Sequence, residues 1–215
     1  MSSTTATAMT TFDPKPVDGG PGPARRPSPS WVPVRSLAPR HRPRVLDHLL
    51  QLSAHDRYLR FGHPATDAQV ARYVDQIDFD RDEVFGIVNR RLELIALAHL
   101  AYLGDRRRSA EAEFGVSTLD SARGRGLGAR LFDHAALHAR NRGVARLVIH
   151  ALAENAAMLR LARRAGAAVE RHGAEAEAVL KLPPISLSDR LRTLLDEQAA
   201  ELDYGLKRQA FRFNR

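Results

Sequence analysis

The feature that most constrains the fold of this chain is a strand, turn, helix and strand pattern between residues 110 and 152. AEAEFGVSTL (110–119) is typical of a strand, and residues 126–142 carry apolar side chains at helical spacing up to Gly143, a favoured residue for ending a helix. VARLVIHAL (144–152) indicates a buried strand. Because crossover connections are right-handed, this strand is expected to lie parallel to the strand at 110–119.

The segments on either side predict hairpins and further helices. Before the crossover we expect a strand over 31–37, a helix opened by Pro39, a helix capped by Thr66 or Asp67, and strands 84–90 and 92–103 joined at Asn89-Arg90-Arg91. After it we expect a helix over 155–164 and a closing hairpin. The predicted fold class is α/β (α+β), with a mixed, mostly antiparallel central sheet, one parallel strand pair and flanking helices.

Composition divides the chain into three regions. Residues 1–30 are rich in Ser, Thr, Pro and Gly, so we expect a disordered tail. Residues 31–183 form the folded domain, and 184–215 predict an amphipathic helical extension that begins at Ser188. Its apolar stripe could pack on the core or on a second copy of the chain, so a homodimer is possible. The stripe consists of Leu191, Leu194, Leu195 and Leu202.

The composition also excludes several classes of protein. No apolar run approaches the roughly 20 residues that span a bilayer, and no secretory signal is visible, so we expect a cytoplasmic protein that does not enter membranes. The absence of cysteine excludes disulfides, thiolate metal sites and a cysteine nucleophile, and we assign no metal. The net charge of +8 comes with scattered arginines whose only block is Arg106–Arg108, so nucleic acid is an unlikely partner.

The turn Arg123-Gly124-Arg125-Gly126-Leu127-Gly128 lies between the strand at 110–119 and the helix that follows. The first N–H groups of a helix lack intrahelical acceptors and favour anions, and glycine lets a phosphate approach the backbone closely. A Rossmann turn would stand in the first strand-helix unit, and a Walker loop would contain Gly-Lys-Ser/Thr. The turn therefore predicts a different kind of phosphate site.

Arg123, Gly126 and Gly128 form an R-x-x-G-x-G motif that resembles the coenzyme A pyrophosphate loop of the GNAT N-acetyltransferase superfamily. The Asn155 helix, with Met158 and Leu159, is similar to the next signature of that family, and the resemblance covers about residues 31–182. It implies a splayed parallel strand pair and acetyl-CoA as the acyl donor. The implied coenzyme-binding residues are Val116, Ser117, Thr118, Arg123, Gly124, Arg125, Gly126, Leu127, Gly128, Ala129, Asn155 and Met158.

Glu113 is the candidate general base. Glu111 and Glu113 share one face of a strand, and a solvated sheet face is the alternative explanation for both carboxylates. Bacterial protein-lysine acetyltransferases of the superfamily carry a base glutamate ten residues before the loop arginine, and Glu113 stands ten residues before Arg123. The segment LSAHDRYLRF (52–61) also resembles that subgroup.

One position departs from the family pattern, since Ala162 stands where many members carry a tyrosine acid. A thiol with a pKa of about 8.5 can still leave unprotonated. His99, Tyr58 and Tyr73 are expected to be packing residues. The chain is thus expected to move an acetyl group from acetyl-CoA to a primary amine, either a protein lysine or a small molecule. The alternative is a non-catalytic acyl-CoA-binding module.

Overall fold

The computed structural model describes residues 32–104, 110–184, 195 and 198–209. The compact unit that holds the described residues begins at Val32. Several sequence expectations concern residues outside the described ones: the tail at 1–30, Trp31, the arginine block Arg106–Arg108, Ser188, Leu191 and Leu194.

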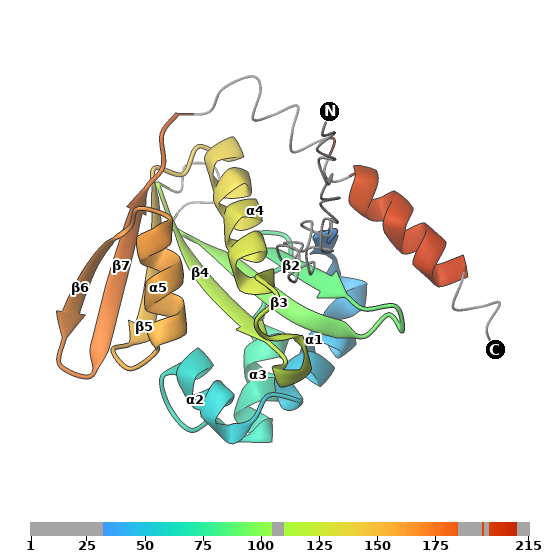
Figure 1. Cartoon of the computed structure of the whole chain (residues 1–215), viewed down its shortest axis with the longest axis horizontal. Helices are drawn as coiled ribbons and strands as arrows, with labels where there is room; N and C mark the ends of the chain where they lie inside the picture. The colour runs from blue at the N-terminus through green and yellow to red at the C-terminus, as the bar shows by residue number, and fades with distance from the viewer. Residues whose placement is uncertain (1–31, 105–109, 185–194, 196–197, 210–215) are drawn as a thin grey trace, which may run out of the picture. The chain divides into compact units, whose positions relative to one another are not determined.

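The described residues build a seven-stranded sheet with the strand order β1-β2-β3-β4-β5-β7-β6 (Figure 1). Every neighbouring pair is antiparallel except β4 and β5, which are parallel. This confirms the predicted mixed sheet with one parallel pair. The strands are β1 (Arg35–Leu37), β2 (Glu83–Val88), β3 (Leu94–Leu103), β4 (Glu111–Thr118), β5 (Arg146–Leu152), β6 (Ala168–His172) and β7 (Glu175–Lys181).

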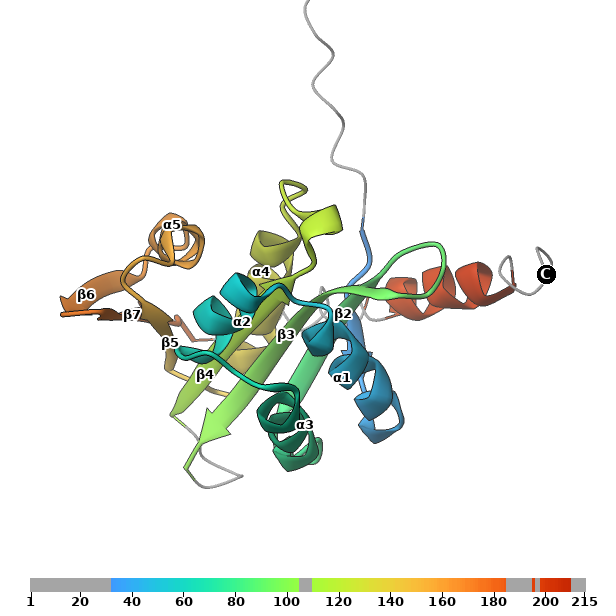
Figure 2. The ribbon, with the colours of Figure 1, turned by 90° about the horizontal axis from the view of Figure 1, so that it is seen from below.

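Helices cover both faces of the sheet, with α4 and α5 on one face and α1 and α3 on the other (Figures 1 and 2). The helices are α1 (Arg42–Leu50), α2 (Ala54–Phe61), α3 (Asp67–Gln76), α4 (Leu127–Asn141) and α5 (Ala156–Arg164), with short 3-10 turns at Pro39–His41 and Asp120–Ala122. No helix among the described residues is long and apolar enough to cross a membrane.

Helix α2 was not expected from the sequence as a separate helix. It begins after Ser53, whose hydroxyl accepts a hydrogen bond from the Asp56 N–H at 3.1 Å, and it ends at Gly62 in the left-handed conformation (φ 78°). The helix therefore has an ordinary start signal at Ser53 and an ordinary stop signal at Gly62. The segment is only eight residues long, so it offers little more than two turns over which an apolar pattern can repeat.

Strand β4 alternates its side chains between the two layers, as the pattern at 110–119 predicts. Phe114 packs edge-to-face on Phe132 of α4, with ring centroids 5.0 Å apart. Ser117 points to the opposite face, where it bonds His48 of α1. The strand is therefore held between both helical layers, which fixes the side on which Glu113 and Gly115 lie.

The parallel strands β4 and β5 pair only at their first residues. Glu111–Glu113 lie beside Arg146–Val148, and no later residue of β4 is in register with β5. Beyond this point β5 pairs with β7 along its whole length, and α2 contacts both β4 and β5 at the open end. One edge of the β4 backbone after Glu113 thus has no strand partner within the described part of the chain, so it can serve a ligand.

The C-terminal extension contributes a helix at residues 198–209 that contacts the region of β1 and α1. The Arg35 guanidinium lies 3.5 Å from the centre of the Tyr204 ring and 2.7 Å from Glu201. Arg44 Nη1 donates to the Tyr204 hydroxyl at 3.0 Å. Leu195 and Leu202, the two leucines of the expected stripe that are described, are mostly exposed. The contacts of this helix at 198–209 with the two arginines are made by Tyr204 and Glu201.

Candidate active site

The glycine-rich turn enters α4 through two residues in the left-handed conformation. Gly124 has a φ of 72° and Gly126 a φ of 73°, values that side chains rarely allow. Gly126 occupies the N-cap position and supplies no side-chain acceptor, so the first N–H groups of α4 have no protein partner of the usual capping kind. A Cβ at Gly128 would meet no protein atom within 4 Å. The backbone N–H groups at the start of α4 therefore face open space without a side-chain cap.

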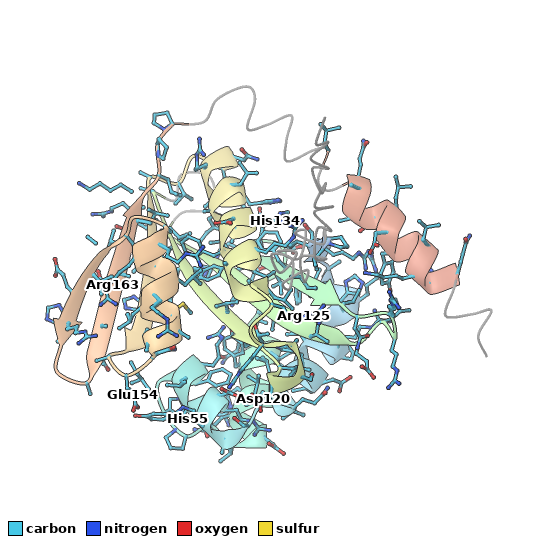
Figure 3. All side chains as sticks on the ribbon, viewed as in Figure 1. His55, Asp120, Arg125, His134, Glu154 and Arg163 are labelled. Carbon is cyan, nitrogen blue, oxygen red and sulfur yellow. The ribbon has the colours of Figure 1, made fainter. Side chains whose placement is uncertain are left out.

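That space is a cavity of about 540 Å³, the donor cavity, which lies between β4, α2, α5 and the turn. Of the coenzyme-binding residues expected from the sequence, eleven line it: Val116, Ser117, Thr118, Arg123, Gly124, Gly126, Leu127, Gly128, Ala129, Asn155 and Met158. Arg125 is exposed and is not one of its lining residues. Figure 3 shows Asp120, Arg125, His55 and Glu154 around the same end of the domain, with His134 farther along α4.

Arg123 is held by carboxylates in the structure. Its guanidinium pairs with Asp56 of α2 and, at 3.0 Å, with Asp120. The side chain is 49 % exposed, so these pairs are weak and a phosphate could replace them. Arg123 is therefore oriented toward the cavity wall before any ligand arrives.

A second cavity of about 460 Å³, the acceptor cavity, lies on the β5 and β7 side of β4. Glu113 lines this cavity rather than the donor cavity. Glu175 and Glu177 of β7 line it as well, together with His150 and His172. His150 lies 3.9 Å from the Glu177 carboxylate. The wall thus concentrates negative charge, which favours a cationic molecule.

The two cavities meet at β4 and share part of their walls. The residues common to both are Leu59, Arg60, Val116, Asn155 and Met158. The two cavities are therefore adjacent, with these five side chains in the wall of both. This meeting point, which we call the junction, lies where β4 has lost its parallel partner.

Asn155 has two structural tasks at the junction. Its Oδ1 accepts the Met158 N–H at 3.1 Å and so caps α5, and its Nδ2 lies 3.5 Å from the Leu59 carbonyl of α2. The neighbouring Glu154 bonds the Tyr58 hydroxyl, which raises the pKa of Tyr58. Helix α2 is therefore attached to the α5 side as well as to the turn.

Ser117 uses its hydroxyl within the protein. His48 Nδ1 lies 2.8 Å from the Leu94 carbonyl, so this nitrogen must donate, and Nε2 must then accept from Ser117 Oγ at 2.9 Å. Burial lowers the pKa of His48 to about 4. The ring is thus neutral near pH 7. Its hydrogen bond holds the Ser117 hydroxyl in place at the wall of the donor cavity.

Sequence reasoning missed part of this site. Leu59 and Arg60 lie in the segment 52–61 that resembles the lysine acetyltransferases, so the signal was present although no role was assigned. No sequence pattern indicates a role for Glu175 and Glu177, because only the pairing of β5 with β7 brings them to the cavity that Glu113 lines. Ala162 is fully buried and lines neither cavity. The described residues contain no cluster of metal-binding side chains.

A sheet with one splayed parallel pair, a glycine-rich turn at its open end and cavities that meet across the gap defines an acyltransferase class of α/β fold. The comparisons agree. Residues 33–168 match the model of the acetyltransferase (GNAT) domain family. The chain therefore belongs to the GNAT acetyltransferase family and is an N-acetyltransferase, a family that uses acetyl-CoA as co-substrate in general.

Solved structures share the fold at low sequence identity. The GNAT domain of S. lividans PAT is 24 % identical with a TM-score of 0.60, over 69 % of this chain and 89 % of that one. An N-acetyltransferase from Staphylococcus aureus Mu50 is 14 % identical with a TM-score of 0.55, over 72 % and 100 %. A cAMP-binding acyltransferase from Mycobacterium smegmatis is 21 % identical with a TM-score of 0.50, over 83 % of this chain but only 51 % of that one.

Proposed function

We propose that this enzyme moves an acetyl group from acetyl-CoA to a primary amine by direct transfer, with Glu113 as the general base. The observation that carries the proposal is the junction of the two cavities beside β4, with the glycine-rich turn on the donor side and Glu113 on the acceptor side. Neither partner then needs a covalent intermediate on the protein, because both can reach the same point.

The donor cavity suits the polyphosphate and the extended arm of acetyl-CoA. The N–H groups at the start of α4 and the guanidinium of Arg123 offer donors and positive charge to the pyrophosphate. The free edge of β4 after Glu113 offers backbone groups to the amide-containing arm. A donor of this length would place its thioester at the junction.

The acceptor cavity suits an amine that arrives as an ammonium ion. A lysine-type amine with a pKa of about 10.4 is only roughly one part in a thousand neutral near pH 7.4, so the reaction needs a group that takes a proton. Glu113 is the carboxylate of this cavity on β4 itself, two residues from Gly115 at the same face. Glu175 and Glu177 would attract the cation, whether it is a protein lysine or a small molecule.

The transfer balances with Glu113, the two substrates and solvent water. The ammonium gives one proton to Glu113, directly or through water, and the neutral nitrogen attacks the carbonyl carbon of the thioester. The new C–N bond forms, the C–S bond breaks with its electron pair on sulfur, and the nitrogen loses its second proton to water. Glu113 then returns its proton to solvent, and the coenzyme A thiolate takes up a proton in solution. The products are an amide and coenzyme A.

The first test compares Glu113→Gln with the parent protein by following thiol release from acetyl-CoA in the presence of amines. We expect kcat to fall about 10²- to 10⁴-fold, because the amide cannot accept the proton. The affinity for coenzyme A should stay within about 2-fold, since Glu113 does not line the donor cavity. The chain has no cysteine, so every thiol detected belongs to the coenzyme.

Glu111→Gln is the matched control, because Glu111 lies on the same strand and face but lines neither cavity and pairs with Arg146. Its kcat should change less than about 3-fold. Unchanged turnover in Glu113→Gln would remove Glu113 from the mechanism. Tight coenzyme binding without thiol release for any amine would favour the non-catalytic alternative.

A further inference from the structure

Arg60 is the only charged residue among the five that line both cavities. It reaches the junction from α2 and lies flat against β4 at Gly115. A Cβ at position 115 would come within 2.7 Å of Arg60 Nη2 and 2.8 Å of its Cζ. Glycine at 115 therefore provides the space that lets a guanidinium rest on the strand.

The Arg60 side chain is fixed from behind by a chain of hydrogen bonds. Arg60 Nη2 donates to the Tyr73 hydroxyl at 2.7 Å, and that hydroxyl lies 2.7 Å from His99 Nδ1. His99 Nε2 lies 3.1 Å from the Asp82 carboxylate. Three secondary-structure elements and the start of β2 thus contribute to the position of one cation.

The hydrogen bonds from Arg60 through Tyr73 and His99 to Asp82 have a direction that follows from the chemistry of their end groups. The Asp82 carboxylate can only accept, so His99 Nε2 donates to it, and the Arg60 guanidinium can only donate, so the Tyr73 oxygen accepts from it. In the tautomer of His99 that carries its proton on Nε2 alone, Nδ1 accepts from the Tyr73 hydroxyl. A chain that runs from a cation to an anion with all donors aligned is strengthened by mutual polarisation.

Asp82 is the anion at the end of this series of hydrogen bonds, opposite Arg60. Its side chain is 6 % exposed, and it also accepts from Arg81 Nε at 3.1 Å and the Tyr102 N–H at 3.3 Å. Burial alone would raise the pKa of Asp82, but the hydrogen bonds from His99 and Arg81 outweigh burial and keep this pKa below its ordinary value. The carboxylate therefore remains charged at neutral pH.

We propose that Arg60, positioned by Tyr73, His99 and Asp82, stabilises the thiolate that leaves when the acetyl group is transferred. This inference rests on the proposed function. Ala162 stands where many members of the family carry a tyrosine acid, and its side chain has no proton to give to the departing sulfur. The leaving thiolate therefore needs another source of stabilisation. A fixed cation at the junction stabilises the negative sulfur without transferring a proton.

The charge balance of the step is simple. When the C–S bond breaks, its electron pair stays on the sulfur of coenzyme A, and the new thiolate carries one negative charge. Arg60 contributes one positive charge and keeps all its protons, so the thiolate can leave the site and take up a proton in solution. Tyr73, His99 and Asp82 act through Arg60 and are positioning residues.

The test measures the thiol pKa of coenzyme A bound to the protein, from the thiolate absorbance as the pH is raised. A cation close to a thiol lowers its pKa by about 1–3 units. We expect the pKa of bound coenzyme A to be lower in the parent protein than in Arg60→Gln by this amount. The chain contains no cysteine, and tyrosine ionisation is removed by titrating each protein without ligand.

Further variants separate charge from position. Arg60→Lys should recover part of the shift, because it keeps the charge and loses the planar fork. Tyr73→Phe should raise the thiol pKa by less than Arg60→Gln does, since Arg60 stays charged but loses its anchor. Arg72→Gln is the matched control: Arg72 is exposed on α3 and lines neither cavity, so its loss should leave the thiol pKa unchanged. Thermal unfolding of each variant checks the fold.

Turnover gives an independent readout, in which Arg60→Gln should lower kcat about 10- to 100-fold and change the KM for acetyl-CoA little. Equal thiol pKa values in the parent protein and folded Arg60→Gln would overturn the role of Arg60 and leave the proposed function standing. If Arg60→Gln does not fold, the other two variants decide. Thiol pKa values in Arg60→Lys and Tyr73→Phe that both equal the value in the parent protein would then overturn the role of Arg60. Failure of the parent protein to bind coenzyme A would overturn both proposals.

Discussion

At the scale of single residues, the glycines around α4 show how one residue type serves two purposes. Gly126 and Gly143 flank the helix and both have positive φ angles, which other residues adopt only at a cost. Gly128 lies within the first turn, has no such angle, and faces the donor cavity. Glycine at 128 therefore leaves open room in the wall of the donor cavity.

This difference leads to a pair of opposite expectations. Gly128→Val should lower the affinity for coenzyme A at least about 10-fold and leave the free energy of unfolding within about 1 kcal/mol, because a Cβ at this position meets no protein atom within 4 Å. Gly143→Ala should cost about 1 kcal/mol of stability through its φ of 81° and bind coenzyme A normally. Calorimetric titration and urea unfolding measure both quantities, and an unaltered affinity in Gly128→Val would argue against a ligand at this turn.

At the scale of elements, two short helices pack at the edge of the hydrophobic core. Helix α2 joins the turn through Asp56 and the α5 side through Leu59 and Tyr58, so it closes the open end of the splayed strands. The helix at 198–209 is attached through Tyr204 beside Arg35 and Arg44. Both elements depend on tertiary contacts more than on their own propensity.

The attachment of the C-terminal helix can be tested with two substitutions on it. Tyr204→Ala should lower the free energy of unfolding by about 1–2 kcal/mol, because it removes a cation–π contact and a hydrogen bond with arginines. Leu202→Ala should cost less than about 0.5 kcal/mol, because Leu202 is 71 % exposed. Urea denaturation decides, and a larger loss for Leu202 would indicate that the apolar stripe is covered in solution, as in a homodimer.

At the scale of the whole molecule, buried histidines make stability depend on pH. Burial lowers the pKa of His48 to about 4 and that of His134 to about 3, below the ordinary value of 6.5. His134 packs against Phe85 with ring centroids 4.8 Å apart, and its Nε2 has no hydrogen-bond partner in the described part of the chain. Both rings are therefore held neutral by the fold.

The sign of the pH effect follows from these directions. The unfolded chain binds protons at His48 and His134 below about pH 6.5, and the folded chain does not, so acid favours unfolding. We expect the free energy of unfolding to be level above about pH 6.5 and to fall as the pH drops toward 4, with His48 alone contributing about 3 kcal/mol. Urea unfolding at several pH values measures this slope.

Two variants identify the source of that slope. His134→Leu should make it shallower, because one buried ring no longer titrates on unfolding. His172→Ala, at an exposed position on β6, should leave it as it was. A stability that does not vary between pH 7 and pH 4.5 would show that the buried rings are accessible to protons in the folded state.

The amino-acid sequence by itself determined the local structure of this protein. The crossover from β4 to β5, the caps at Thr66 and Asn155, and the turn before α4 all follow from residue type and short spacings, which sequence patterns report directly. The face of β4 on which Glu113 lies was also predictable, because side chains along a strand alternate between the two faces of the sheet.

Only the tertiary structure decided which distant residues complete the site. The glutamates of β7 line the same cavity as Glu113 because β7 lies between β5 and β6 in the sheet. Arg60 reaches the junction because α2 contacts both β4 and β5. Likewise, Tyr73, His99 and Asp82 look like ordinary packing or loop residues along the chain. Their alignment behind Arg60 depends on long-range pairing, since residues far apart in sequence meet only when the sheet and its helices assemble.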